Sequence, residues 1–211
     1  MKTRAEIKEL AKLNMSGFYW PCVGTAFLVP LFLGACGSIS LGLATLVLTG
    51  PMIAGMNYFF VQVFKGDGNT VDMGTPFSVG FKEFGRKLGG YWWMYLWTWL
   101  WSLLLVIPGI IKMYSYSMTM YILSDCPGVR AQDALKLSMR MMAGHKWELF
   151  VFQLSFIGWQ ILNGFTFGLL GIFYVTPYMC TSFAGFYLEV REEALRQGII
   201  TLGQLEGREY V

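Results

Sequence analysis

The spacing of charged residues constrains this chain more than any other feature. Residues 17–64 and 149–188 contain no charged side chain, and residues 88–124 contain only Lys112. A helix needs about 20 apolar residues to cross the hydrocarbon layer of a membrane. Each block is therefore long enough for about two crossings. Barrel strands, in contrast, alternate polar and apolar residues in units of about 10 residues, and these blocks are too long and too continuously apolar for that pattern.

Composition supports a lipid environment. The chain is 55% hydrophobic and 14% charged, whereas soluble domains carry about 25% charged residues. A chain of 211 residues cannot hide so many apolar side chains in its interior. We expect an all-α integral membrane protein in which residues 1–211 form one domain with about six transmembrane helices in three hairpins.

The distribution of basic residues predicts the orientation. Every Lys and Arg except Lys112, and all thirteen acidic residues, lie outside the three blocks. If each block is a hairpin, these residues share one face, and the positive-inside rule makes that face cytoplasmic. We therefore expect a multi-pass protein of the bacterial plasma membrane with both termini in the cytoplasm.

A short amphipathic stretch precedes each block. Thr3 and Glu6 have the spacing of a capping box at the start of the first stretch. The apolar faces are Ile7, Leu10 and Ala11; then Phe77, Phe81, Phe84 and Leu88; then Ala131, Ala134, Leu135, Met139 and Met142. Apolar residues at helical spacing opposite basic ones are typical of helices that lie in the membrane interface. The alternative is connecting helices that pack on one another.

The chain also looks like three diverged copies of one unit. The proposed copies are residues 1–66, 67–126 and 127–196, and residues 197–211 would form a cytoplasmic tail. Each copy has glycine and an aromatic group at the start of its block: GFYW, GGYWW and GHKW. We expect these groups to lie at the membrane boundary, where aromatic and basic side chains anchor a protein. The predicted anchors are Trp20, Trp92, Trp93, His145, Lys146 and Trp147.

Several longer stretches point to one family. They include GFKEFGRKL (residues 80–88), IPGIIK (107–112) and GHKWELF (144–150). In combination they resemble the bacterial integral-membrane family catalogued as domain of unknown function 975, most clearly from Phe81 to Tyr187. The resemblance implies a polytopic helical protein of the bacterial plasma membrane. It brings no catalytic residue, substrate or cofactor to this chain.

Lys112 is the one charge inside a block, and it must reach water, phosphate or a polar cavity because a charge at the bilayer centre is costly. Tyr116 and Thr119 follow it at helical spacing. One hypothesis is an anion, substrate or lipid-headgroup site that opens to the outer face and includes Asn57. The alternative is a lysine that extends to the outer interface.

Other polar side chains in the blocks, among them Gln62, Gln153, Gln160 and Asn163, are expected to point inward and form interhelical hydrogen bonds. The prolines Pro51, Pro108 and Pro177 mark either broken helices or first helical turns.

No catalytic constellation is apparent. His145 and Glu148 supply two metal ligands where zinc needs three or four, and no block contains an acidic residue. We therefore predict a protein that is not an enzyme and has no metal or cofactor. Its expected role is lipid interaction or service as a membrane partner of another protein. Membrane lipids are the expected partners, together with a membrane protein or a second copy of the chain, and nucleic acid is not expected at a net charge of +3. The alternative function is a small permease or flippase that uses Lys112 and the proline-broken helices.

Overall fold

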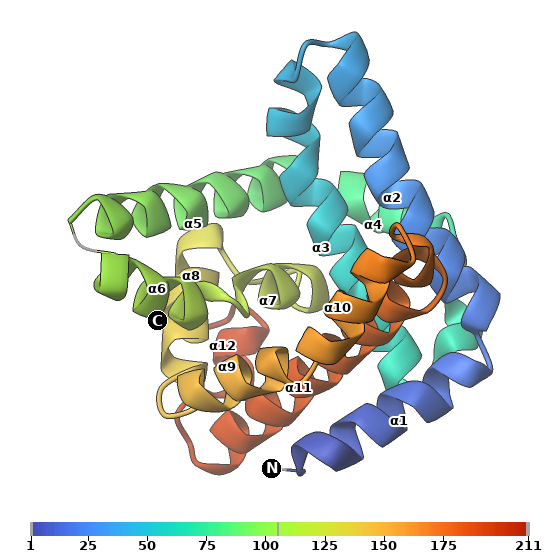
Figure 1. The fold of residues 1–211 in the computed structure, drawn as a ribbon. Coiled ribbons are helices and arrows are strands. Elements are labelled where there is room, and N and C mark those ends of the chain that lie inside the picture. The colour runs from blue at the N-terminus through green and yellow to red at the C-terminus, as the bar shows by residue number, and fades with distance from the viewer. Residues whose placement is uncertain (1, 105, 210–211) are drawn as a thin grey trace.

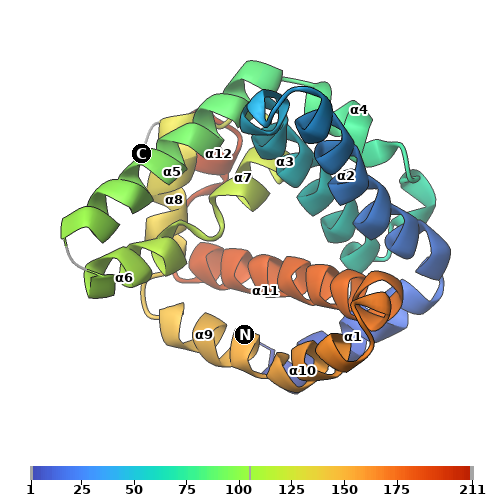
Figure 2. The ribbon, with the colours of Figure 1, turned by 45° about the horizontal axis from the view of Figure 1, so that its top comes forward.

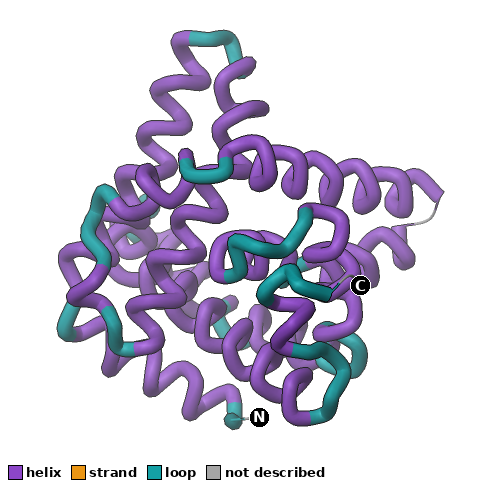
Figure 3. Tube along the Cα trace, turned by 180° about the vertical axis from the view of Figure 1, so that it is seen from behind, coloured by secondary structure: helices purple, strands orange, loops and turns teal. Residues whose placement is uncertain are grey.

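The computed structural model describes residues 2–104 and 106–209, and these residues form helices and loops without a β-strand (Figure 3). This result confirms the all-helical expectation. In chain order the elements are α1 (Arg4–Ser16), α2 (Tyr19–Ile39), α3 (Leu43–Lys65), η1 (Gly68–Thr70), α4 (Thr75–Phe81), α5 (Phe84–Leu104), α6 (Val106–Tyr116), α7 (Thr119–Asp125), α8 (Ala131–Met141), α9 (Lys146–Leu154), α10 (Ile157–Phe165), η2 (Gly171–Val175), α11 (Thr176–Arg196) and α12 (Leu202–Leu205).

Three helical hairpins make up most of the molecule, and a short helix precedes each one. α1 leads into the α2–α3 hairpin, α4 into α5 and α6–α7, and α8 into α9–α10 and η2–α11. The hairpins run in different directions: α2 and α3 project at the top of Figure 1, whereas α5 and α6 extend to the left. α9 and α10 lie alongside α11, and Figure 2 shows this third hairpin crossing below the other two. Each hairpin with its preceding helix corresponds to one of the three proposed copies. That these copies arose from one repeated unit stays a prediction.

Two of the described helices, α2 and α3, are long and apolar enough to cross a membrane. The other hairpins contain interrupted helices. α6 and α7 are separated at Ser117 and Met118, and α9 and α10 at Ser155 and Phe156. Helices of membrane-spanning length and composition are therefore present, but these lengths do not establish six crossings.

A serine from another helix occupies the break between α6 and α7. The Ser138 hydroxyl, fully buried on α8, donates to the carbonyl oxygen of Ser115 at 2.8 Å. It also accepts a hydrogen bond from the backbone N–H of Met118 at 3.2 Å. A side chain inserted into the ladder of backbone hydrogen bonds is a known cause of a helix break. The predicted prolines do not cause this break, because Pro108 lies in the first turn of α6 and Pro177 in that of α11.

The apolar faces of α1 and α8 are covered by protein, which is the alternative to the interfacial placement that we expected. Ile7 and Ala11 of α1 are fully buried where this helix packs against α11 and α3. Ala134 and Leu135 of α8 are buried in the same core. α8 packs against α5, α7 and α6 as well as α11, so neighbouring helices remove both faces from solvent.

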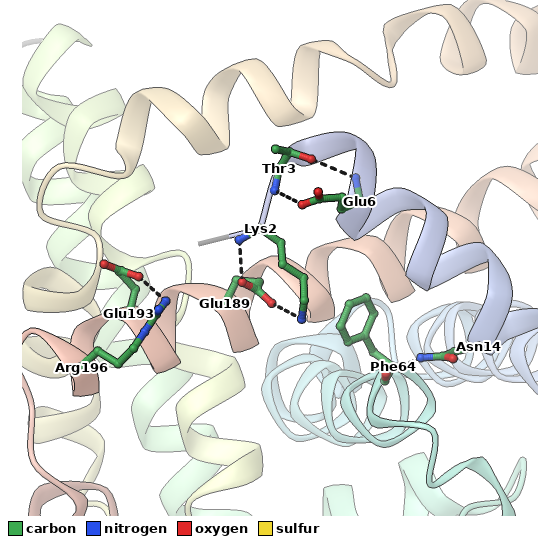
Figure 4. Close-up of polar contacts among 8 residues, drawn as sticks. All are labelled: Lys2, Thr3, Glu6, Asn14, Phe64, Glu189, Glu193 and Arg196. Carbon is green, nitrogen blue, oxygen red and sulfur yellow. Dashed lines mark hydrogen bonds and ion pairs between the residues drawn. The ribbon is translucent and has the colours of Figure 1, made fainter.

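Hydrogen bonds also connect α1, and Lys2 before it, to α11 and α3 (Figure 4). The predicted capping box is present, with the Thr3 hydroxyl accepting from the N–H of Glu6 and the Glu6 carboxylate accepting from the N–H of Thr3. Lys2 donates to the Glu189 carboxylate of α11 through its Nζ at 2.7 Å and its backbone N–H at 2.8 Å. The Asn14 amide donates to the Phe64 carbonyl at the end of α3.

Two other expectations need correction. The amphipathic stretch at residues 77–88 is not one helix, because α4 ends at Phe81 and α5 begins at Phe84. Glu83 between them has a φ of 56°, a left-handed conformation that interrupts a helix. The predicted tail is folded as far as residue 209: Thr201 and Gln204 form a capping box on α12, and Ile200 and Leu205 are buried.

Candidate functional site

A cavity of about 520 Å³ lies where the three hairpins meet, and we call it the central cavity. α3 contributes Asn57 and Ile53, and α9 contributes Gln153. The second hairpin contributes the rest of the wall: Tyr91, Met94, Tyr95 and Thr98 from α5, Met113, Tyr114 and Tyr116 from α6, and Ser117, Met120 and Tyr121 beyond it. The wall is thus mostly apolar surface, with hydroxyl and amide groups at intervals.

One hydrogen bond joins the second and third hairpins at this wall. The Tyr114 hydroxyl donates to Oε1 of Gln153 at 2.8 Å. Gln153 therefore makes the interhelical hydrogen bond expected of a polar side chain in an apolar block. Tyr114 and Gln153 both line the central cavity. Tyr114 also lines a neighbouring apolar groove of about 380 Å³ with Lys146 and Trp147, so this residue separates the two spaces.

The structure brings two of the predicted site residues to the central cavity and leaves two outside its wall. Asn57 and Tyr116 line it, whereas Lys112 and Thr119 do not. The expected stripe from Lys112 through Tyr116 to Thr119 is interrupted, because α6 ends at Tyr116 and α7 begins at Thr119. Thr119 is fully buried, and its hydroxyl lacks a hydrogen-bond partner in the described part of the chain.

Lys112 lies over aromatic rings. Its Nζ is 5.0 Å from the ring centroid of Trp101 and 5.9 Å from that of Tyr116, which are distances of cation–π contacts. The same atom is 4.0 Å from the sulfur of Met139 on α8. We expected Lys112 near the outer face and α8 at the cytoplasmic face. In a hairpin that stands upright in the membrane, Lys112 and Met139 would then lie at opposite faces. Their contact shows that the two expectations cannot both hold for such a hairpin.

The predicted anchors occupy different environments. Trp20 and Trp147 are 67% and 70% exposed, as an interfacial indole would be. Trp93 is half-buried and stacks edge-on against Trp97. The Trp92 indole donates to the carbonyl oxygen of Leu46 in the first turn of α3. That turn is the end of α3 expected to face outside, so this contact also departs from six upright helices.

His145 and Glu148 do form a pair. Nδ1 of His145 lies 2.8 Å from Oε2 of Glu148, at the first turn of α9. No third acidic, histidine or cysteine side chain joins them, and the described residues contain no group of three such side chains that could hold a metal ion. The pair is a side-chain hydrogen bond within one helical turn, with Lys146 and Trp147 between its members.

Comparison with known proteins relates one part of the chain to a family. Residues 91–194 match the family described as "Protein of unknown function (DUF975)". The chain is therefore similar to that family over these residues. No curated protein and no solved structure matches the chain. The DUF975 segment begins at Tyr91 and includes every residue of the central cavity wall except Ile53 and Asn57.

Sequence reasoning missed most of the DUF975 residues at the cavity. Tyr91, Tyr95 and Tyr114 were not singled out, although all three line the cavity. Their position along α5 offered a signal. Tyr91, Met94, Tyr95 and Thr98 recur at intervals of three and four residues, the period of one helix face.

Proposed function

We propose that this chain is a multi-pass protein of the bacterial plasma membrane whose central cavity binds an amphipathic membrane molecule, such as a lipid, without catalysing a reaction. The proposal includes six helices in three hairpins that enter the lipid, with both termini in the cytoplasm. The hairpins would be inclined to one another, as Figures 1 and 2 suggest, instead of forming an upright bundle.

The hairpin tips support insertion into lipid. Leu41 at the first tip is 95% exposed, and Phe167 at the third is 98% exposed. Water around such side chains carries a free-energy cost of roughly 25 cal/mol for each Å² of apolar surface. Both residues adopt a positive φ before a glycine with a positive φ, so the first and third tips share one type of turn. The exposed apolar residues at the three tips are Ile39, Leu41 and Leu43; Leu103, Val106 and Ile107; and Phe165, Phe167 and Leu169.

The composition of the central cavity wall carries the functional proposal. Binding sites for small amphipathic molecules are mostly apolar, with a few polar groups that fix orientation. The central cavity has such a wall, and its volume of about 520 Å³ lies within the usual range for ligand sites. All three hairpins contribute to it, so a bound molecule would contact each of them.

Filling the cavity tests the proposal. Thr98→Phe adds a ring at the cavity wall, and Leu100→Phe on the exposed side of the same helix is the matched control. We would extract each protein in membrane nanodiscs, transfer it to detergent, and measure retained lipid by native mass spectrometry. We expect the wild type and Leu100→Phe to retain lipid in a fixed stoichiometry and Thr98→Phe to lose it. Equal retention by both variants would contradict the proposal.

The second candidate is a small permease or flippase. Its support is the presence of Asn57 and Tyr116 in one cavity, which gives a membrane-embedded space some polar lining. Lys112 does not share this lining, and for this reason we rank transport second. Movement of a fluorescent lipid between the leaflets of proteoliposomes would test it, with Asn57→Leu and Lys112→Met as variants. A rate above that of empty liposomes, lost in Asn57→Leu, would favour transport over simple binding.

A further inference from the structure

A second pocket, of about 310 Å³, lies between α3, α4, α5 and α7, away from the central cavity, and we call it the cationic pocket. Lys82, Arg86 and Lys87 line it from the start of α5 and the link that precedes it. Tyr58 and Gln62 of α3 and Asp125 of α7 line it from the other sides. The basic residues of this pocket precede the block 88–124, whose one charge is Lys112, so they lie outside the proposed membrane spans.

The carboxylates at the cationic pocket are already engaged. Asp125 accepts from Lys65 at 3.1 Å and from Arg191 at 2.8 Å, and it also accepts from the Tyr187 hydroxyl. Glu83 accepts from Nε of Arg86 at 2.8 Å. Lys82 and Lys87 have no carboxylate partner in the described part of the chain. The region therefore holds five basic side chains for two carboxylates: Lys65, Lys82, Arg86, Lys87 and Arg191 against Glu83 and Asp125.

Arg86 has little capacity left for a ligand. Besides Glu83, it donates to the carbonyl oxygens of Leu123, Cys126 and Val129, and so closes the end of α7 and the loop after it. Its role is to hold the wall of the pocket. The cations available to a ligand are Lys82, which is exposed, and Lys87.

Lys87 is a buried cation. Lys87 is only 3% exposed, and its Nζ donates to the carbonyl oxygens of Val79 and Lys82. Burial, together with the positive charge of Arg86, lowers the pKa of Lys87 to about 8. Carbonyl groups satisfy its hydrogen bonds but do not neutralise its charge, and the positive end of the α5 dipole adds to the local potential. An anion in the pocket would therefore remove an electrostatic penalty that the protein otherwise carries.

We propose that the cationic pocket binds a phosphate group, carried by a phospholipid headgroup or by a soluble phosphate compound. Lys82 and Lys87 supply the charge, and the Tyr58 hydroxyl and Gln62 amide supply neutral hydrogen-bond donors. Neither of these two side chains has a hydrogen-bond partner among residues 2–104 and 106–209. The proposal is independent of the central cavity and does not require that cavity to bind a lipid.

Thermal unfolding of the purified full-length chain in an uncharged detergent tests the proposal. The probes are inorganic phosphate and glycerol 3-phosphate, and sodium chloride at equal ionic strength is the reference. Lys82→Gln removes one cation from the pocket. Lys12→Gln, an exposed lysine on α1, removes the same charge elsewhere. We expect both phosphates to raise the unfolding temperature of the wild type and Lys12→Gln. For Lys82→Gln we expect a dissociation constant about tenfold higher, the usual result of losing one charged hydrogen bond.

Equal effects of chloride and phosphate, or equal phosphate responses in the two lysine variants, would overturn the proposal. A third variant, Lys87→Met, removes the buried cation. We expect it to lose the phosphate response, and its basal unfolding temperature is measured alongside because the carbonyls of Val79 and Lys82 also lose their donor. If this variant does not fold, Lys82→Gln still decides the question.

A final comparison distinguishes the two sources of phosphate. Dihexanoyl phosphatidic acid carries the same phosphate as glycerol 3-phosphate but adds short acyl chains. Tighter binding of this lipid, abolished in Lys82→Gln, assigns the pocket to phospholipid headgroups. Equal affinity for the two compounds assigns it to soluble phosphates. Binding of dihexanoyl phosphatidic acid that Lys82→Gln leaves unchanged would show that the acyl chains, and not the pocket, are recognised, and would contradict the proposal.

Discussion

The Tyr114 hydroxyl donates to the side-chain oxygen of Gln153 at 2.8 Å, and this bond links the second hairpin to the third at the wall of the central cavity. Between the same two helices, α6 and α9, the Tyr114 ring lies edge-on to Phe150. The bond therefore fixes how two hairpins of different direction lie against each other. It also separates the central cavity from the groove that contains Trp147.

Removing this hydrogen bond should loosen the contact modestly. We expect Tyr114→Phe and Gln153→Leu each to lower the free energy of unfolding by about 0.5–1.5 kcal/mol, the usual net value of a hydrogen bond. The double variant should cost less than the sum of the two, because the partners interact directly. Unfolding in mixed detergent micelles would measure the cycle. A coupling energy of zero would show that the bond contributes nothing.

Loss of the Ser138 hydroxyl should be more damaging. Ser138→Ala leaves the N–H of Met118 and the carbonyl of Ser115 without this partner inside the protein. We expect a loss of about 1–3 kcal/mol, because buried polar groups then remain unsatisfied. Ser124→Ala is the control, since that hydroxyl donates only to Tyr121 of its own helix. An equal free energy of unfolding in the two variants would contradict the claim that the Ser138 hydroxyl stabilises the break between α6 and α7.

Gly55 allows α3 and α4 to approach closely. A Cβ atom at this position would lie 1.9 Å from the carbonyl oxygen of Pro76, which is backbone and cannot turn aside. We expect Gly55→Ala to destabilise the protein by at least about 2 kcal/mol. Gly34→Ala on α2 meets nothing within 4 Å, and we expect it to be neutral or slightly stabilising through helix propensity. Similar melting temperatures for the two variants would refute the close approach.

The Lys2–Glu189 contact should make stability depend on acid pH. Burial alone would raise the pKa of Glu189, but the hydrogen bonds from Lys2 outweigh it and hold the pKa below the ordinary value of 4.5. A carboxylate with a lowered pKa stabilises the fold above the unfolded-state pKa and loses that contribution as pH falls through the folded-state pKa. We therefore expect Glu189→Gln to cost about 1 kcal/mol at pH 7, since Lys2 is half-exposed.

This difference between the wild type and Glu189→Gln should shrink as pH falls below 4.5. Melting temperatures from pH 7 to pH 3 would measure it. Glu9→Gln removes an exposed carboxylate of α1 that has no hydrogen-bond partner in the described residues, and we expect no such trend from it. A gap between Glu189→Gln and the wild type that stays constant with pH would contradict the assignment.

The sequence predicted the helical class and the capping box of Thr3 and Glu6 at the start of α1, because these depend on local features: long apolar runs and the spacing of two residues. It also predicted that Gln153 bonds to another helix, since a polar amide in an apolar block needs a partner, but the Gln153 side chain is exposed and does not point into the bundle. These signals act within one helix or within one block.

The contacts between hairpins could not be predicted in the same way. The apolar faces of α1 and α8 have the pattern of interfacial helices, but the pattern is the same whether lipid or neighbouring helices cover the face. The break near Ser117 depends on Ser138, a residue 21 positions away in the sequence, and no local motif marks it. The predicted stripe of Lys112, Tyr116 and Thr119 is interrupted at this break, because the prediction assumed one continuous helix.

The placement of the hairpin tips tests the central proposal most directly. In a chain with its four cysteines replaced, single cysteines would be introduced as Leu41→Cys, Val106→Cys and Phe167→Cys at the tips, and as Lys12→Cys at the opposite end. Right-side-out membrane vesicles would then be treated with a membrane-impermeant maleimide. We predict labelling of the three tip sites in intact vesicles and labelling of Lys12→Cys only after permeabilisation. Labelling of Lys12→Cys in intact vesicles, or tips that react only after permeabilisation, would contradict three hairpins that cross the membrane from the cytoplasm.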